Sequence, residues 1–309
     1  IYIVTDQMHV IVVMAPSGAF FNQVLIDNAV SAAHGRVIEA HRVAVPVSLA
    51  DHREVIKFLI DCSDPEILSA RLRQLSDQHG IDIALQSRLS RCRPYGLAVF
   101  DMDSTLISCE VIDELARIAG VGTEVAEITE RAMRGEVDFD ESFRKRLALL
   151  EGLDARAVDE LADQLPVQSG LSEMATTLKA RGLKLAIFSG GFMPIAERLK
   201  NDYGFDDVVA NELEIRDGKV TGKIVPPIVN REYKAAALAA LASRLGIQTE
   251  HCIAVGDGAN DLSMMALAGL GVAFHAKPAV RAASPIEITH IGLDGVCYLM
   301  GHEGEFSAV

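Results

Sequence analysis

Short apolar runs alternate with amphipathic segments over the first ninety residues. The runs that we predict to be strands lie at 9–15, 36–47, 55–60 and 81–86, and the predicted helices lie at 19–33 and 65–79. Gly35 is expected to stop the first helix, and Asp64 to cap the second, which Pro65 begins with a preset φ. The predicted order is βαββαβ, a small α+β sandwich.

A polar and basic segment, 88–94, follows this pattern. It carries Arg88, Arg91 and Arg93 before Pro94 and lacks a periodic apolar pattern. We therefore predict a small α+β domain over 1–87, a linker over 88–94 and a second domain over 95–309.

Apolar strands alternate with helices in the second domain. The predicted strands lie at 97–100, 184–188, 207–210, 252–255 and 271–274. This alternation is typical of an α/β fold with a doubly wound, Rossmann-like parallel sheet. The helical stretch at 111–165 is longer than one crossover needs, so we predict an inserted helical cap at about 108–168. Asp217-Gly218 between two alternating arms predicts a hairpin.

Charge and composition exclude several classes of function. The net charge is −14, which argues against a nucleic-acid partner, because phosphate backbones need clustered Lys and Arg. None of the apolar runs approaches the roughly 20 residues that cross a bilayer, so a membrane partner is not expected. Five scattered cysteines without a CxxC pair fit neither a disulfide framework nor a zinc site. With no secretion signal in the sequence, we expect a cytoplasmic protein.

Acidic residues follow two of the predicted strands directly. The first strand leads into Asp101 and Asp103, and the strand at 252–255 leads into Asp257 and Asn260-Asp261. Parallel strands carry their sites at their carboxyl ends, so both groups are expected at one edge of the sheet. Magnesium prefers oxygen ligands of this kind. Each group taken alone is also consistent with a tight turn or a helix cap.

Two further signals accompany the acids. Ser189 and Gly190 follow the strand at 184–188, where a hydroxyl and exposed N–H groups can hold phosphate oxygens. Lys234 begins an alanine-rich helix and can balance the carboxylates. A plain loop and a solvent-facing lysine are the alternative interpretations.

Together these motifs resemble those of the haloacid dehalogenase superfamily of phosphatases, over about 97–301. More narrowly, they resemble its phosphoserine phosphatases. The residues that carry this resemblance are Asp101 to Thr105 with Glu110, Val137 to Phe139 with Arg144 to Arg146, Phe188 to Phe192, and Gly256 to Asp261. By element order alone, the first domain resembles the amino-acid-binding ACT-type domain.

The resemblance implies a catalytic role for each motif. Asp101 is the expected nucleophile, which forms an aspartyl-phosphate, and Asp103 is the expected proton shuttle. The implied Mg²⁺ ligands are Asp101, Asp257 and the backbone carbonyl of Asp103. The other implied roles are phosphate binding by Ser189, Gly190 and Asn260, charge balance by Lys234, and orientation of Lys234 or metal-bound water by Asp261.

The resemblance also implies the substrate, O-phosphoserine, and the last step of serine biosynthesis. Glu110 is expected to meet its ammonium group and Arg146 its carboxylate, which a guanidinium pairs bidentately. Met133 and Phe139 would form an apolar wall, although ordinary packing between cap helices is the alternative for both.

Two other functions are left open by the sequence. One is a phosphatase or phosphotransferase that acts on another small phosphomonoester. The other is an amino-acid-binding regulatory protein without catalysis. A homodimer is also left open.

Overall fold

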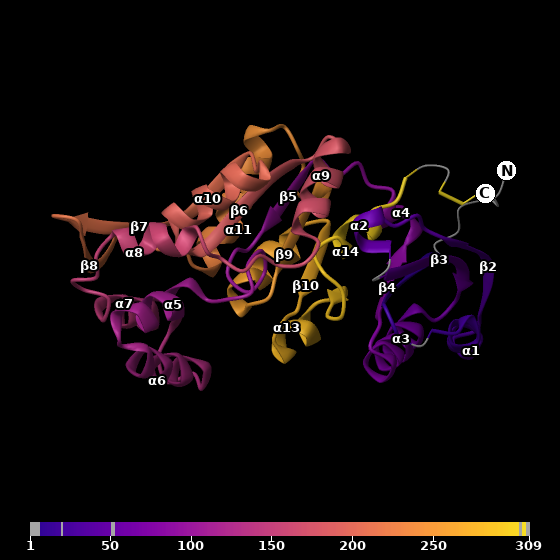
Figure 1. The fold of residues 1–309 in the computed structure, drawn as a ribbon. Coiled ribbons are helices and arrows are strands. Elements are labelled where there is room, and N and C mark those ends of the chain that lie inside the picture. Colours follow the sequence, from indigo (N-terminus) through magenta and orange to yellow (C-terminus); the bar gives the residue numbers. More distant parts are fainter. Residues whose placement is uncertain (1–6, 20, 51–52, 303–304, 307–309) are drawn as a thin grey trace. The chain divides into compact units, whose positions relative to one another are not determined.

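The computed structural model describes residues 7–19, 21–50, 53–302 and 305–306. The chain forms two compact units. Unit 1 consists of Ile1–Tyr95, Ser169–Leu178 and Val272–Val309, and unit 2 consists of Gly96–Gln168 and Lys179–Gly271. Figure 1 shows the helices and strands of both units, coloured along the sequence.

A four-stranded antiparallel sheet is the centre of unit 1, with strand order β2-β3-β1-β4. Its strands are β1 (Met8–Pro16), β2 (Gly35–Arg42), β3 (Arg53–Cys62) and β4 (Asp82–Ser87). The helices are α1 (Gln23–Ala32), the short α2 (Val47–Ala50) and α3 (Pro65–His79). Apolar residues of α1 and α3 share one core with the strands, including Ile26, Leu68 and Phe58. The predicted small α+β fold is confirmed.

Two details at the helix ends differ from the prediction. The left-handed residue after α1 is His34, with φ 54°, whereas Gly35 already begins β2. Gly35 is needed for another reason, because a Cβ there would lie 2.6 Å from the carbonyl oxygen of Asp61. Pro65 does begin α3, but the Asp64 side chain makes no capping bond. It lies 2.6 Å from Nδ1 of His34 instead, so a partner thirty positions away replaces the local cap.

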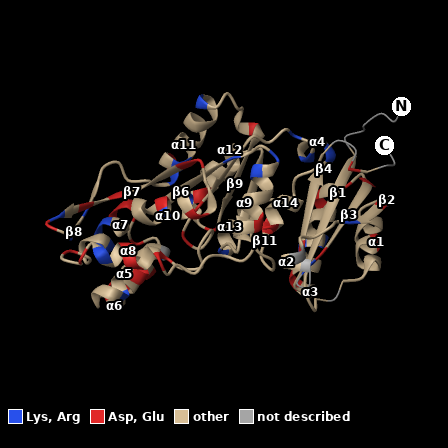
Figure 2. Cartoon of the chain, turned by 45° about the horizontal axis from the view of Figure 1, so that its top comes forward, with Lys and Arg blue, Asp and Glu red and all other residues tan. Residues whose placement is uncertain are grey.

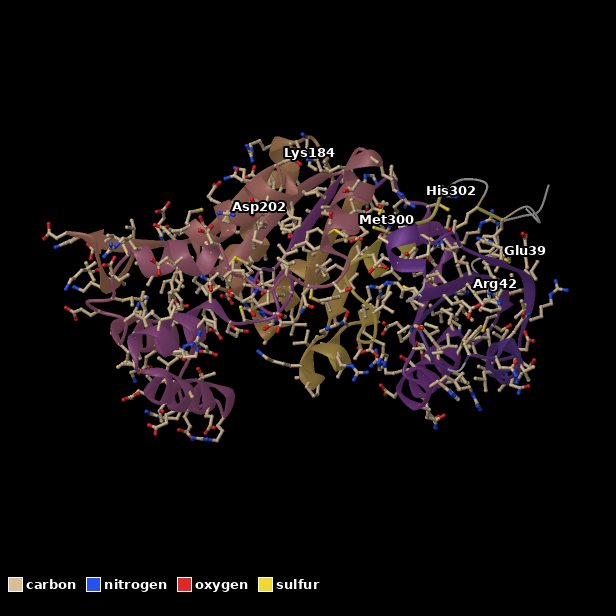
Figure 3. The ribbon with its side chains drawn as sticks, in the orientation of Figure 1. Glu39, Arg42, Lys184, Asp202, Met300 and His302 are labelled. Atoms are coloured by element: carbon tan, nitrogen blue, oxygen red, sulfur yellow. The ribbon has the colours of Figure 1, made fainter. Side chains whose placement is uncertain are left out.

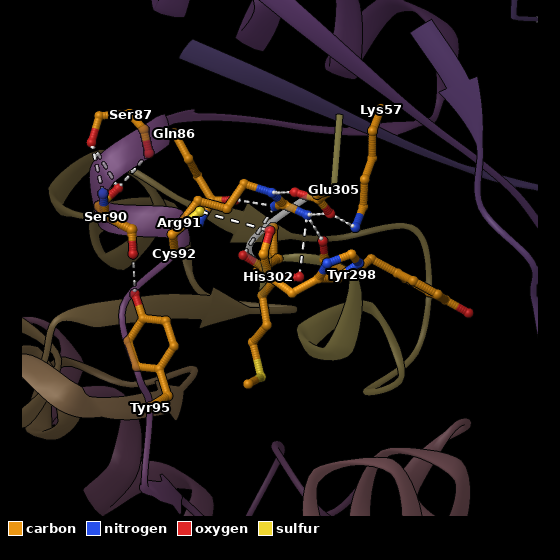
Figure 4. Close-up of polar contacts among 12 residues, drawn as sticks. Lys57, Gln86, Ser87, Ser90, Arg91, Cys92, Tyr95, Tyr298, His302 and Glu305 are labelled. Carbon is orange, nitrogen blue, oxygen red and sulfur yellow. Dashed lines mark hydrogen bonds and ion pairs between the residues drawn. The ribbon is translucent and has the colours of Figure 1, made fainter. Parts of the chain in front are cut away.

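The predicted linker begins with the short helix α4 (Arg88–Arg91), and Arg91 is fully buried in unit 1. Its guanidinium donates to Gln86, to Glu305 and to three carbonyl oxygens, those of Tyr298, Leu299 and Met300 (Figure 4). Lys57 forms an ion pair with the same Glu305. The basic run of the sequence therefore contains a buried charge whose partner lies more than two hundred positions later.

Segments from the second half of the chain complete unit 1. They are most of α9 (Leu171–Ala180), β10 (Leu270–Phe274), α13 (Pro278–Ala283), β11 (Glu287–Ile288) and α14 (Gly295–Tyr298), and β10 pairs with β11 in parallel. Asp82 of β4 accepts hydrogen bonds from the backbone N–H groups of Thr289, His290 and Ile291. Burial raises the pKa of Asp82, although these three donors act in the opposite direction.

Unit 2 contains a parallel sheet in which β5 (Leu97–Phe100) lies between β6 (Lys184–Phe192) and β9 (Cys252–Gly256). β7 (Asp207–Arg216) continues the sheet beside β6, and β8 (Lys219–Val225) returns antiparallel to β7. The helices of this part are α10 (Met193–Tyr203), α11 (Arg231–Arg244) and α12 (Leu262–Leu267), with 3-10 turns η1 (Thr249–His251) and η2 (Ala259–Asp261).

The α/β class with a parallel sheet, predicted from the alternation of strands and helices after residue 95, is confirmed. β5 and β9 are buried along their whole length, as expected of central parallel strands. At the periphery, the side chains of Lys184 and Asp202 are exposed (Figure 3). Asp217 and Gly218 form the hairpin turn between β7 and β8 with φ of 51° and 75°, which matches the Asp-Gly signal.

Four helices follow β5 and form the cap: α5 (Val111–Ala119), α6 (Gly122–Met133), α7 (Phe139–Ala148) and α8 (Arg156–Ala162). Acidic side chains recur on these helices (Figure 2). Among the helices that the structure describes, none is both long and apolar enough to cross a membrane.

Candidate active site

Two neighbouring strands bring the acidic motifs together. β5 pairs with β9 in parallel, and Phe100 lies opposite Val255. The N–H group of Asp101 donates to the carbonyl oxygen of Val255 at 2.9 Å, so the first acid is fixed at the strand end. Asp257 follows β9 at the same edge.

Three buried carboxylates form a cluster at this edge. One oxygen each of Asp101, Asp257 and Asp261 lies within 4.8 Å of the others. Lys234 enters the cluster from the first turn of α11, where Nζ donates to Oδ1 of Asp101 at 2.7 Å and to Oδ1 of Asp261 at 2.8 Å. The other oxygen of Asp261 accepts the N–H group of Gly258 at 3.0 Å. Asp261 is therefore held by two donors and in turn holds the lysine.

The cluster carries more negative than positive charge when its acids are ionised, since three carboxylates face one ammonium group. Burial and the charge of Asp261 raise the pKa of Asp101 well above its ordinary value, against the effect of Lys234. Burial alone would lower the pKa of Lys234, but Asp101 and Asp261 outweigh it and raise that pKa. A buried, oxygen-only site with this excess charge fits a divalent cation such as Mg²⁺.

Asp103 lies beside this cluster and points toward the cap. Its Oδ1 accepts the N–H group of Val111, the first residue of α5, at 2.9 Å. Its Oδ2 accepts the hydroxyl of Ser189 at 3.4 Å. Burial, and secondly the charge of Glu110, raise the pKa of Asp103 to about 7. A carboxyl group in that range can both give and take a proton near neutral pH.

The Ser-Gly-Gly motif forms the end of β6 rather than following it. We predicted the strand to end at Phe188, but its bounds extend to Phe192, with an irregular register against β7 over the motif. The N–H group of Gly191 donates to Oγ of Ser189 at 2.8 Å. A Cβ on Gly191 would lie 2.5 Å from Oδ2 of Asp103, so only glycine fits there. A Cβ on Gly190 would lie 4.0 Å from Nδ2 of Asn260, which brings Asn260 to the same loop.

Arg146 and Glu110 lie where the cap meets this site. Ser104 donates its hydroxyl to Glu110 at 2.9 Å. Arg146 of α7 is half-buried, and its Nε is buried without a hydrogen-bond partner among the described residues. Burial lowers the pKa of Arg146, while the charges of Asp113, Glu110 and Asp103 act in the opposite direction. The guanidinium is therefore within electrostatic range of the site.

Of the two residues predicted to form the apolar wall, the structure describes the side chain of Phe139 but not that of Met133. Phe139 is 38% exposed and stacks on Phe143 with ring centroids 6.3 Å apart. Its Cζ would lie 3.5 Å from a Cβ on Gly190, so the ring faces the Ser-Gly-Gly motif. Met133 ends α6, but its side chain lies outside the described part of the structure.

One buried polar residue of the site was missed by the sequence analysis. Asn211 of β7 donates to the carbonyl oxygen of Gly190 at 2.7 Å and accepts the N–H group of Val229 at 2.8 Å. The available signal was a polar residue directly after the predicted strand at 207–210, and no role was predicted for it.

Known proteins match the chain over this site. Residues 95–269 match the haloacid dehalogenase-like hydrolase family. The phosphoserine phosphatase SerB2 of Mycobacterium tuberculosis is 45% identical over 242 residues, which cover 78% of this chain. The chain spans 59% of the length of that relative. Further relatives described as phosphoserine phosphatases are 41% to 46% identical.

Solved structures agree with this match. A hydrolase of the same family from Salmonella enterica serovar Typhi has a TM-score of 0.85 and 33% identity, and the match covers 97% of this chain and all of that one. A phosphoserine phosphatase described as a phospho-aspartyl intermediate analogue has a TM-score of 0.63 and 39% identity, over 67% of this chain and 99% of that one. The chain therefore belongs to the haloacid dehalogenase-like hydrolases, alongside the phosphoserine phosphatases that it resembles.

Proposed function

We propose that the chain is a phosphatase that hydrolyses O-phosphoserine to serine and phosphate, with Mg²⁺ as cofactor and an aspartyl-phosphate on Asp101 as intermediate. The observation that carries the substrate is the guanidinium of Arg146, whose Nε is buried without a hydrogen-bond partner in the part of the chain that the structure describes, and on which the charges of Glu110 and Asp103 act. The relatives named phosphoserine phosphatase support the same substrate.

Asp101 is the nucleophile in this proposal. Its Oδ1 accepts both the ammonium of Lys234 and the N–H group of Met102, at 2.7 and 2.8 Å. Two donors on one oxygen hold the carboxylate in one orientation, so we assign Oδ2 to the attack on phosphorus. As Oδ2 bonds to phosphorus, the bond from phosphorus to the serine oxygen breaks.

Asp103 moves the protons. In its acid form it protonates the leaving serine oxygen, and it then removes a proton from the water that hydrolyses the aspartyl-phosphate. A pKa of about 7 suits both roles. The cap helix α5 keeps the group in place, because the N–H group of Val111 holds one of its oxygens.

The carboxylates of Asp101 and Asp257 and the backbone carbonyl of Asp103 would hold Mg²⁺. When bound, the ion supplies positive charge that offsets the charge of the phosphoryl group. Asp261 is proposed to orient Lys234 and not to bind the ion. Both of its oxygens already accept hydrogen bonds, one from Lys234 and one from the N–H group of Gly258.

The phosphoryl oxygens are bound by the hydroxyl of Ser189, the N–H group of Gly190, Asn260 and Lys234. These groups come from two strand ends and one helix start, so the fold positions them before substrate arrives. Phosphoryl transfer depends mainly on the positioning of such groups and on stabilisation of the charge of the phosphoryl group.

In this proposal, residues of the cap bind the amino-acid end of the substrate. Glu110 meets the ammonium group and Arg146 the carboxylate. Phe139 contributes an apolar wall from α7, and Met133 is proposed to do the same from α6. Each charged group of O-phosphoserine then has a partner of opposite sign.

The setting of the reaction is part of the proposal. Release of serine from phosphoserine is the last step of serine biosynthesis, and we propose a cytoplasmic location. All five cysteines are free, which is consistent with a reducing compartment. Five further points stay predictions. They are an ACT-like role for residues 1–87, the linker at 88–94, the start of the catalytic domain at 95, the cap bounds of about 108–168, and a homodimer.

Phosphate release tests the function directly. The full chain is assayed with phosphoserine, phosphothreonine, phosphoethanolamine and phosphoglycolate, each with Mg²⁺ and with excess chelator. We expect the highest kcat/KM for phosphoserine, and we expect phosphate release to stop when excess chelator is present. A higher kcat/KM for another substrate would replace phosphoserine, and absence of release from all four would overturn the phosphatase assignment.

A further inference from the structure

Asn211 is a fully buried polar residue beside the Ser-Gly-Gly motif. It belongs to β7, the strand beside β6, and its side chain makes two hydrogen bonds to backbone groups outside its own strand. Nδ2 donates to the carbonyl oxygen of Gly190 at 2.7 Å, and Oδ1 accepts the N–H group of Val229 at 2.8 Å. An amide side chain can donate from one terminal atom and accept at the other.

The first bond acts on a single peptide group. The carbonyl of Gly190 and the N–H group of Gly191 belong to the same planar peptide unit. Asn211 holds its carbonyl, and the N–H group of that unit donates to Oγ of Ser189 at 2.8 Å. Because Oγ of Ser189 accepts this bond, its hydroxyl proton is directed away from the Gly191 N–H group and toward Asp103. The distance from Oγ to Oδ2 of Asp103 is 3.4 Å.

The second bond acts on the start of α11. Val229 directly precedes Asn230, whose side chain caps the helix by accepting the N–H group of Tyr233 at 3.1 Å. The carbonyl of Asn230 accepts the N–H group of Lys234 at 2.9 Å. Fixing Val229 therefore fixes the helical turn that carries Lys234 into the acidic cluster.

We propose that Asn211 is a positioning residue that ties the Ser189–Gly191 loop to the helix start carrying Lys234. This inference rests on the proposed function of the same site, because the two groups that Asn211 aligns are those assigned to the phosphoryl group. Asn211 acts on the reaction through Ser189 and Lys234 and does not touch the substrate itself.

Asn211→Leu removes both bonds while keeping the branched shape and the number of side-chain heavy atoms. The peptide unit of Gly190 and Gly191 then loses its anchor inside a buried site. We expect the protein to fold and kcat to fall by about tenfold to a hundredfold, because displacements of about 1 Å in a positioned group cost that much. KM should change less than kcat, since Glu110 and Arg146 still bind the amino-acid end.

A matched control separates positioning from loss of stability. Ser76 is a buried polar residue of unit 1 whose hydroxyl donates to the carbonyl of Ile81. Ser76→Ala also removes a buried hydrogen bond, and we expect it to lower the melting temperature with kcat unchanged. If both variants lower kcat by the same factor, Asn211 is an ordinary structural residue and the proposal is wrong.

A double-mutant cycle tests the route through Ser189. In the Ser189→Ala background, Asn211→Leu has no hydroxyl to misalign, so the factor by which it lowers kcat should be smaller by about threefold or more, and the remainder is the part that acts through Lys234. A factor that shrinks by less than about threefold would mean that Asn211 does not act through Ser189. Should the leucine variant not fold, Asn211→Ser, which is too short to reach both partners, takes its place, and wild-type kcat in that variant would overturn the proposal.

A wrong role for Asn211 can be distinguished from a wrong substrate by using two substrates. Every variant is assayed with O-phosphoserine and with p-nitrophenyl phosphate. If the wild type hydrolyses only the aryl phosphate, the phosphoserine assignment is wrong while the role of Asn211 is still measured on that substrate.

Discussion

Nζ of Lys234 lies 2.7 Å from Oδ1 of Asp101, and both side chains are buried. Lys234 is on α11 and Asp101 follows β5, 133 positions earlier, so the pair joins two elements that are distant in sequence. Removing Lys234 would leave the buried carboxylates of Asp101 and Asp261 without their ammonium partner, so the three residues form a unit.

Asp101→Asn is expected to abolish turnover while the fold is retained. The amide keeps the shape and can still accept from Lys234, but it cannot form the aspartyl-phosphate. Phosphate release and covalent labelling by substrate are the measurements. Steady-state turnover by the pure variant within tenfold of the wild type would contradict the assignment of the nucleophile.

Asp257→Asn is expected to weaken Mg²⁺ binding to the full chain. It removes one of the carboxylates from a site where Mg²⁺ uses only one or two of them. Titration calorimetry with Mg²⁺ alone measures this without any assay of activity. Glu136→Asn serves as control, because that carboxylate is exposed and paired with Arg134. Equal affinity in the Asp257 variant and the wild type would make Asp257 a turn residue.

Gly191→Ala is expected to lower kcat by more than tenfold. A Cβ there would lie 2.5 Å from Oδ2 of Asp103 and 2.7 Å from Cε of Met102, so the proposed proton shuttle has to move. Gly122→Ala is the matched control, since the nearest atom to its added Cβ is 3.8 Å away. A Gly191 variant as active as the Gly122 variant would show that Asp103 tolerates displacement.

Arg146→Ala is expected to lower kcat/KM for phosphoserine at least tenfold, and to lower that for phosphoethanolamine far less. Phosphoethanolamine lacks the carboxylate that Arg146 is proposed to bind, and a charge pair under a cap costs about 2–5 kcal/mol to break. The second substrate accounts for general damage to the cap. Equal losses on both substrates would make Arg146 structural.

The sequence predicted the strands of unit 2 and the acids at their ends because these depend on local patterns. β5 and β9 are short apolar runs, and their parallel pairing brings Asp101 and Asp257 to one edge. Arg91 could not be predicted in the same way, because its burial depends on Glu305, 214 positions away. Asn211 was missed for a similar reason, since its partners, Gly190 and Val229, lie in other segments.

Glu305 provides a prediction for the stability of unit 1 against pH. Burial alone would raise the pKa of this carboxyl, but Arg91 and Lys57 outweigh it and lower the pKa to about 2, from an ordinary value of 4.5. A carboxyl with a lowered pKa stabilises the fold above its unfolded pKa, and this stabilisation is lost as the pH falls toward the folded pKa. The window for Glu305 is therefore between about 4.5 and about 2.

Glu305→Gln keeps the shape and removes the charge. With a side chain only 5% exposed, the charge should contribute roughly 2–3 kcal/mol at pH 7, as the pKa shift implies. Urea unfolding of the wild type and the variant at pH 7 and 3.5 should show this difference shrinking by about 1 kcal/mol, because at pH 3.5 the carboxyl of the unfolded wild type is largely protonated while that of the folded protein is still ionised. Glu136→Gln, in an exposed ion pair with Arg134, should change stability little at either pH. A Glu305 variant as stable as the wild type at pH 7 would mean that Arg91 is held by its carbonyl partners alone.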